Sequence, residues 1–137
     1  MKVTPYLMFD GDCEEALNFY AKAFQGAIKD LMRFEGSPVE VKTDQKRRVM
    51  HANFVAGDLH FMASDTGGDG ISIKGLGHVH LSVDLRDKEE QQKVFDELSK
   101  GGAINMPLQD TFWGARFGML TDRFGINWML NCELPKK

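Results

Sequence analysis

Two stretches of the chain place apolar residues three or four positions apart, which is the period of a helix with one buried face. The first is predicted over Asp12–Gln25, with apolar positions at Ala16, Leu17, Phe19, Tyr20, Ala23 and Phe24. The second is predicted over Asp87–Lys100, with apolar positions at Val94, Phe95 and Leu98. Each begins with an aspartate followed three residues later by a glutamate, which indicates a capping box. Gly26 and Gly101 are the expected residues just beyond the two helix ends.

The landmarks of the two predicted helices are related by one constant offset. Four pairs are each separated by 75 residues: Asp12 and Asp87, Glu15 and Glu90, Tyr20 and Phe95, Gly26 and Gly101. Side-chain identity between the two copies is low, but the residues that begin and end each helix recur at the same interval. This pattern is typical of a duplicated supersecondary unit.

Runs of strand length lie before and after each helix. In the first half they are Val3–Phe9, Ala27–Phe34, Val49–Ala56 and Leu59–Ser64, and in the second His78–Val83, Ala103–Leu108, Ala115–Thr121 and Ile126–Cys132. We therefore predict an α+β chain in which residues 1–137 form a single domain of two βαβββ modules, about 1–66 and 76–134. Residues 67–70, which are rich in glycine, form the connection between the modules.

The pair Gly57-Asp58 lies between two apolar runs and suits a two-residue hairpin turn. This turn pairs Ala56 with Leu59, and side chains then alternate between the two faces of the sheet. One face is apolar and is expected under a helix: Met50, Ala52, Phe54, Leu59, Phe61 and Ala63. The other is mixed and suits the wall of a pocket: His51, Asn53, His60, Met62 and Ser64.

Composition and charge exclude several classes of protein. The formal net charge of -3 argues against a nucleic-acid surface, and no apolar run reaches the length of a membrane span. The sequence begins without the apolar segment of a secretory signal, so the expected location is the cytoplasm. The two cysteines, Cys13 and Cys132, form no metal motif and are expected to pack as free thiols.

Three groups of residues resemble the PhnB-like branch of the vicinal oxygen chelate superfamily, which includes glyoxalases and bleomycin-resistance proteins. The opening reads Pro5-Tyr6-Leu7-x-Phe9-x-Gly11-x-Cys13-Glu14-Glu15-Ala16-Leu17-x-Phe19-Tyr20, and the first hairpin carries His51-Ala52 and Met62-x-Ser64-Asp65. The most specific part is Thr111-Phe112-Trp113-Gly114-x-x-Phe117-Gly118 with Thr121-Asp122-x-Phe124-Gly125-x-x-Trp128. The resemblance implies the glyoxalase/bleomycin-resistance fold, whose mixed sheets curl around a cavity, and a homodimer.

Enzymes of this superfamily hold a divalent metal through one ligand on the first and fourth strands of each module. By resemblance these positions fall at Pro5, Met62, His78 and Met129, although the 75-residue offset places the third at His80. Proline offers no side-chain ligand, and a thioether suits softer metals than those enzymes use. We therefore expect no metal and no cofactor. The alternative is a non-standard site in which His51 and His60 act with His78 or His80.

The predicted ligand pocket combines the mixed hairpin face with His78 or His80 and with three aromatic residues of the second half, Phe112, Trp113 and Trp128. Each tryptophan suits either a pocket or the core. The favoured function is a small-molecule-binding protein without the usual metal site. The alternative is an enzyme on a small, phosphonate-related substrate, with His51 as the best candidate for a base. Some relatives carry a methyltransferase label, but no glycine-rich turn joins a strand to a helix here.

Overall fold

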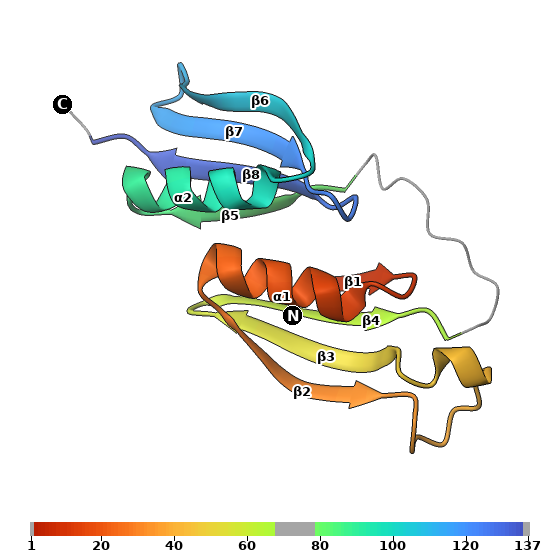
Figure 1. Ribbon diagram of the computed structural model, residues 1–137. Helices are drawn as coiled ribbons and strands as arrows, with labels where there is room; N and C mark the ends of the chain where they lie inside the picture. The colour runs from red at the N-terminus through yellow and green to blue at the C-terminus, as the bar shows by residue number, and fades with distance from the viewer. Residues whose placement is uncertain (1, 68–78, 136–137) are drawn as a thin grey trace. The chain divides into compact units, whose positions relative to one another are not determined.

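The computed structural model describes residues 2–67 and 79–135 (Figure 1). The chain divides into two compact units, Met1–Lys74 and Gly75–Lys137. Within the described residues, each unit contains one β-strand, one α-helix and three further β-strands in that order, and the first unit also has a short 3-10 helix. The predicted α+β class and the two βαβββ modules are confirmed.

The first unit is a four-stranded mixed sheet with one helix against it (Figure 1). Its elements are β1 (Tyr6–Phe9), α1 (Cys13–Phe24), β2 (Ala27–Arg33), the 3-10 helix η1 (Thr43–Gln45), β3 (Val49–Ala56) and β4 (Leu59–Asp65). The strand order is β1-β4-β3-β2, and β1 runs parallel to β4. Strand β1 begins later than the predicted Val3, because Pro5 has no N–H to donate to the ladder; its carbonyl still accepts the Met62 N–H at 3.0 Å.

Aromatic packing fixes α1 on the apolar face of this sheet. The Tyr20 ring lies edge-on to Phe54 and Phe61, with centroid distances of 6.4 and 5.8 Å, and those two rings stack on each other at 4.9 Å. Phe54 and Phe61 are direct partners across β3 and β4, and Ala56 pairs with Leu59. The predicted hairpin register is confirmed. Burying each of these rings contributes roughly 1.5–3 kcal/mol.

The second unit repeats the plan with β5 (Leu81–Leu85), α2 (Lys88–Ser99), β6 (Ala103–Asp110), β7 (Ala115–Thr121) and β8 (Asn127–Glu133), in sheet order β5-β8-β7-β6. The predicted strand His78–Val83 is wrong in its bounds. The parallel ladder with β8 begins at Leu81, opposite Trp128, and ends at Leu85, opposite Cys132. His80 is therefore exposed ahead of the strand, and His78 lies outside the described residues.

The described residues of the second unit include two buried polar side chains, Gln91 and Asp122. Gln91 of α2 is fully buried, and its Nε2 donates to the Arg116 carbonyl at 2.8 Å and to the Leu130 carbonyl at 3.2 Å. These bonds join the helix to β7 and β8. A methyl group added at Gly118 would lie 2.9 Å from the Phe95 ring, so glycine allows α2 to lie close to the sheet. Among the described residues, no helix has the length and hydropathy to cross a membrane.

The two helix starts differ in how they are capped. At α2 the predicted cap is confirmed, since the Asp87 side chain accepts the Glu90 N–H. At α1 the Asp12 side chain makes no cap hydrogen bond, so the predicted capping box is wrong there. A different N–H at this helix start, that of Cys13, is accepted by Oδ1 of Asp65 at the end of β4, at 2.9 Å.

The ends of the two helices differ as well. Gly101 has a φ of 74°, the left-handed conformation expected of a glycine after a helix. After α1 the left-handed residue is Gln25, with φ 54°, and not the predicted Gly26. A methyl group at Gly26 would lie 2.6 Å from the Phe54 ring and 2.8 Å from the Val55 carbonyl oxygen. Glycine is therefore required at this position for close packing.

Both cysteines are buried free thiols, as predicted. Cys13 is fully buried at the start of α1, and this burial raises the pKa of its thiol. The neighbouring loop is held by Arg48, whose Nη1 donates to Asp10 Oδ1 at 2.9 Å. This hydrogen bond lowers the pKa of the Asp10 carboxyl.

Candidate functional site

The face of the first sheet opposite α1 carries a group of polar and thioether side chains, which we call the polar face. The side chains are Tyr6, Met8, His51, Asn53, His60, Met62 and Ser64. Their common orientation follows from strand pairing: Tyr6 lies opposite Met62, which lies opposite Asn53 on the next strand. Because alternate side chains of a strand share a face, His51 and His60 lie on the same side as Asn53.

Four of these side chains form a continuous hydrogen-bonded chain across three strands. The Tyr6 hydroxyl lies 3.2 Å from His51 Nδ1. His51 Nε2 lies 3.5 Å from Asn53 Nδ2, and Asn53 Oδ1 lies 2.9 Å from His60 Nε2. The Tyr6 and His51 rings also touch, with centroids 5.8 Å apart. The structure therefore brings together His51, Asn53 and His60, which the sequence predicted on one face, and adds Tyr6.

The other members of the polar face differ in exposure. Met8 is 45% exposed, and Met32, which pairs with His51 from β2, is 48% exposed. Met62 is half-buried and Ser64 is buried. The accessible part of this face is therefore the hydrogen-bonded chain with thioethers beside it, and Ser64 lies beneath that surface.

Tyr6 was missed because the hairpin register concerns only β3 and β4. Its position depends on β1 pairing in parallel with β4, which joins two segments more than fifty residues apart in the sequence. The available signal was the alternation along β1, where Leu7 and Phe9 are buried and Tyr6 and Met8 are exposed.

In the second unit, a cavity of about 510 Å³ opens at the end of the sheet. Its lining residues are Trp113, Gly114, Ala115, Asn131, Glu133, Leu134 and Pro135. Trp113 is 54% exposed and lies edge-on to Phe112 and Phe117, with centroid distances of 5.1 and 5.7 Å. Phe112 itself is 98% exposed at the tip of the β6–β7 turn. Trp113 thus lines a cavity, and the neighbouring Phe112 is exposed to solvent.

Trp128 has a different position from Trp113, in the core between α2 and the second sheet. It is 1% exposed, and its indole N–H donates to the buried Asp122 carboxylate at 2.8 Å. It pairs with Leu120 across β7 and β8, and Leu120 is fully buried too. Of the two roles that the sequence allowed for this residue, the structure places Trp128 in the core, because its N–H has an internal acceptor.

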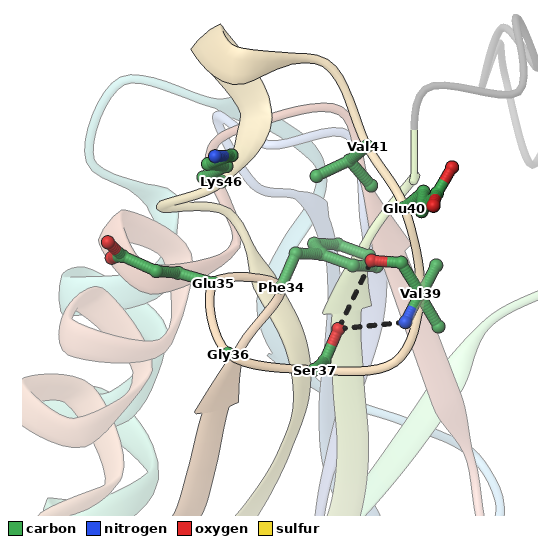
Figure 2. Close-up of a pocket in the computed structure, with 8 residues that line it drawn as sticks. All are labelled: Phe34, Glu35, Gly36, Ser37, Val39, Glu40, Val41 and Lys46. Carbon is green, nitrogen blue, oxygen red and sulfur yellow. Dashed lines mark hydrogen bonds between the residues drawn. The ribbon is translucent and has the colours of Figure 1, made fainter.

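A second cavity, of about 390 Å³, lies in the connection between β2 and β3 (Figure 2). Its lining residues are Phe34, Glu35, Gly36, Ser37, Val39, Glu40, Val41 and Lys46. The Ser37 hydroxyl accepts the Val39 N–H at 3.2 Å and so closes a local turn. Figure 2 shows Phe34 and Val41 inside the loop, with Glu35 and Glu40 directed outward. No set of polar groups converges on this cavity within the described loop.

The described residues contain no group of three or more His, Cys, Asp or Glu side chains that could hold a metal ion. Within the polar face, His51 and His60 both direct Nε2 at the Asn53 amide. Of the four metal positions implied by resemblance, Pro5 uses its backbone carbonyl to bind the Met62 N–H, and His78 lies outside the described residues.

Comparison with known proteins adds the family context. A family model described as 3-demethylubiquinone-9 3-methyltransferase matches residues 1–131. Protein PA1353 from Pseudomonas aeruginosa is 38% identical with a TM-score of 0.87, over 98% of this chain and 99% of that one. A Bacillus cereus chain, whose description names both PhnB and that methyltransferase, is 33% identical with a TM-score of 0.79, over 96% and 99% of the two chains. A glyoxylase/bleomycin resistance protein/dioxygenase domain from Frankia is 17% identical with a TM-score of 0.69, over 100% and 95%, and this likeness shows the shared fold.

Proposed function

Because this chain belongs to the PhnB-like family described as 3-demethylubiquinone-9 3-methyltransferase, within the vicinal oxygen chelate superfamily, we propose that it binds a small molecule on the polar face of its first sheet. The observation that carries the proposal is the chain Tyr6–His51–Asn53–His60. Four polar side chains on three strands use one another as partners while remaining partly exposed. Such convergent polar groups on a rigid sheet are typical of ligand sites.

The thioether side chains beside these four hydrogen-bonded residues support the same function. Met8, Met32 and Met62 offer flexible apolar surface that adapts to a ligand body, while the imidazole, amide and phenol groups supply orientation. The cavity beside Trp113 offers an aromatic wall of the kind that binds planar or apolar groups. We propose this cavity, with Phe112 beside it, as an apolar contact surface of the second unit.

The test is to purify the protein without chelator, measure its metal content, and record native mass spectra for retained small molecules. The ligand found, or the best one from a metabolite screen, is then titrated calorimetrically. His60→Ala is expected to weaken binding about tenfold, because it removes a polar contact worth roughly 1.4 kcal/mol. The matched control is Asp58→Ala in the exposed turn of the same hairpin, which should bind like the wild type. Equal affinity for all three proteins would contradict the proposal.

The second candidate is an enzyme, and the Tyr6–His51 contact favours it. A phenol and an imidazole 3.2 Å apart form a pair that can move a proton to or from a bound substrate. Calorimetric titration with zinc tests for a metal-dependent enzyme: micromolar or tighter one-to-one binding would favour it.

Methyl transfer would require a nucleotide-like methyl donor, and the described residues do not fit one. The N–H groups of Gly11 and Cys13 at the start of α1 are bound to the Asp65 carboxylate at 2.8 and 2.9 Å. At the start of α2 the Glu90 N–H is bound to Asp87. These three N–H groups therefore already have acceptors within the protein and are not available to a cofactor.

We further propose that the protein is a homodimer. Strands β2 and β6 are sheet edges, and the apolar side chain of Ile104 on β6 is 54% exposed. Such edges are commonly covered by another chain. Light scattering at micromolar concentration is expected to give twice the mass of one chain, and a monomer would contradict this prediction.

A further inference from the structure

The amide of Asn53 lies at the centre of the hydrogen-bonded chain and touches both imidazoles. Its Oδ1 lies 2.9 Å from His60 Nε2, and its Nδ2 lies 3.5 Å from His51 Nε2. An amide group has a donor end and an acceptor end, whereas a neutral imidazole has one N–H and one bare nitrogen. The same Nε2 atom of the two histidines therefore meets opposite ends of one amide.

This arrangement assigns opposite tautomers to the two histidines. His60 must carry its proton on Nε2 to donate to the Asn53 oxygen. His51 must leave Nε2 bare to accept from the Asn53 nitrogen, so its proton lies on Nδ1. The Nδ1–H of His51 then donates to the Tyr6 oxygen, 3.2 Å away.

The donor-to-acceptor direction of these hydrogen bonds determines whether Tyr6 donates or accepts toward a ligand. Once its oxygen accepts from His51, the phenol O–H is directed away from the imidazole. Tyr6 is 42% exposed, so this O–H is accessible from outside the sheet. Both nitrogens of His51 are engaged in hydrogen bonds, so His51 acts on a bound ligand only through Tyr6.

We propose that Tyr6 is the hydrogen-bond donor to an oxygen acceptor of the ligand, such as a carbonyl, carboxylate or phosphonate oxygen, and that Asn53 sets its direction through His51. This inference rests on the proposed function and makes it more specific. Tyr6 is the ligand-contacting residue, whereas Asn53 and His51 are positioning residues. Specificity then follows from polarity, since a ligand group with only donors finds no partner at Tyr6.

The polarity is tested by nitrogen NMR of the protein, recorded at alkaline pH. Long-range proton–nitrogen correlations report which ring nitrogen carries the proton. We expect the Nε2–H tautomer for His60 and the Nδ1–H tautomer for His51. Wild-type protein with Nε2–H on His51 overturns the inference.

Two variants with side chains of similar size to the originals test whether Asn53 determines the tautomer of His51. Asn53→Asp replaces the donor end of the amide with an acceptor, so His51 is expected to switch to the Nε2–H tautomer. Tyr6→Phe removes only the hydroxyl and should leave the Nδ1–H tautomer in place. A switch in Tyr6→Phe, or none in Asn53→Asp, overturns the role of Asn53.

The ligand class is tested with methylphosphonate as an oxygen-acceptor probe and methylammonium as a donor-only control. Methylphosphonate is expected to shift the Tyr6 and His51 resonances saturably, with about tenfold weaker binding in Tyr6→Phe, and methylammonium is not. Methylphosphonate binding without a shift at Tyr6, or with equal affinity in Tyr6→Phe, overturns the assignment of the donor. Because the tautomers are read without any ligand, a protein with the expected tautomers that binds no small molecule at all contradicts the proposed function alone.

Discussion

Replacing Asp65 with asparagine is expected to destabilise the chain by about 3 kcal/mol, because one end of the new amide presents a donor where backbone N–H groups now donate. The carboxylate is 3% exposed. Its Oδ1 accepts the Gly11 and Cys13 N–H groups at 2.8 and 2.9 Å, and its Oδ2 accepts the Val49 N–H at 2.9 Å. One side chain thus satisfies the start of α1 and the start of β3 together.

In either orientation, the asparagine amide leaves at least one buried backbone N–H without an acceptor. With nitrogen at the Oδ2 position, the Val49 N–H loses its acceptor. With nitrogen at the Oδ1 position, the Gly11 and Cys13 N–H groups lose theirs. An unsatisfied buried donor costs roughly 1–3 kcal/mol, and the bond it replaces was to a charged group.

Urea unfolding followed by circular dichroism measures the effect. The matched control is Asp58→Asn, in the exposed turn after β3, which is expected to change stability by less than about 0.5 kcal/mol. An Asp65→Asn protein with the midpoint of the wild type would show that the three backbone donors find other partners.

Replacing Trp128 with phenylalanine is expected to cost about 2–3 kcal/mol of unfolding free energy, through a cavity in the core and a lost hydrogen bond. The indole is 1% exposed and donates to Asp122 Oδ2 at 2.8 Å. Asp122 is itself buried, and its Oδ1 accepts the Phe124 and Ile126 N–H groups in the turn between β7 and β8. Loss of the indole N–H removes a neutral donor from a buried carboxylate.

Trp113→Phe provides the matched control, because the same substitution is made at a residue that is 54% exposed. Its stability is expected to lie within about 0.5 kcal/mol of the wild type. If Trp113 lines the ligand site, Trp113→Phe weakens ligand binding. Trp128→Phe, measured under conditions in which it is folded, is expected to bind the ligand with the affinity of the wild type. The reverse pattern would contradict the placement of both side chains.

Local patterns were sufficient to predict the elements of this fold. The apolar spacing of the two helices predicted Asp12–Gln25 and Asp87–Lys100, and the structure has helices at Cys13–Phe24 and Lys88–Ser99 with those residues as caps. The hairpin register followed from the Gly57-Asp58 turn, because a two-residue turn determines every pair beyond it. These features depend on residues close together in the chain.

Features that join distant segments were not predictable in the same way. Asp65 accepts the Cys13 N–H at the start of α1 from a position 52 residues away, whereas the Asp12 side chain makes no cap hydrogen bond although the local sequence predicted one. The bounds of β5 depend on its parallel ladder with β8, since isolated strands have no signal of where pairing begins.

The candidate site shows the same division. The sequence by itself determined that His51, Asn53 and His60 share a face, because strand alternation is a property of the backbone. Only the tertiary structure decided that Tyr6 completes their hydrogen-bonded chain, and that Trp128 is a core residue while Trp113 lines a cavity. Those outcomes depend on which distant partner occupies the space beside each side chain, and that is set by packing between elements.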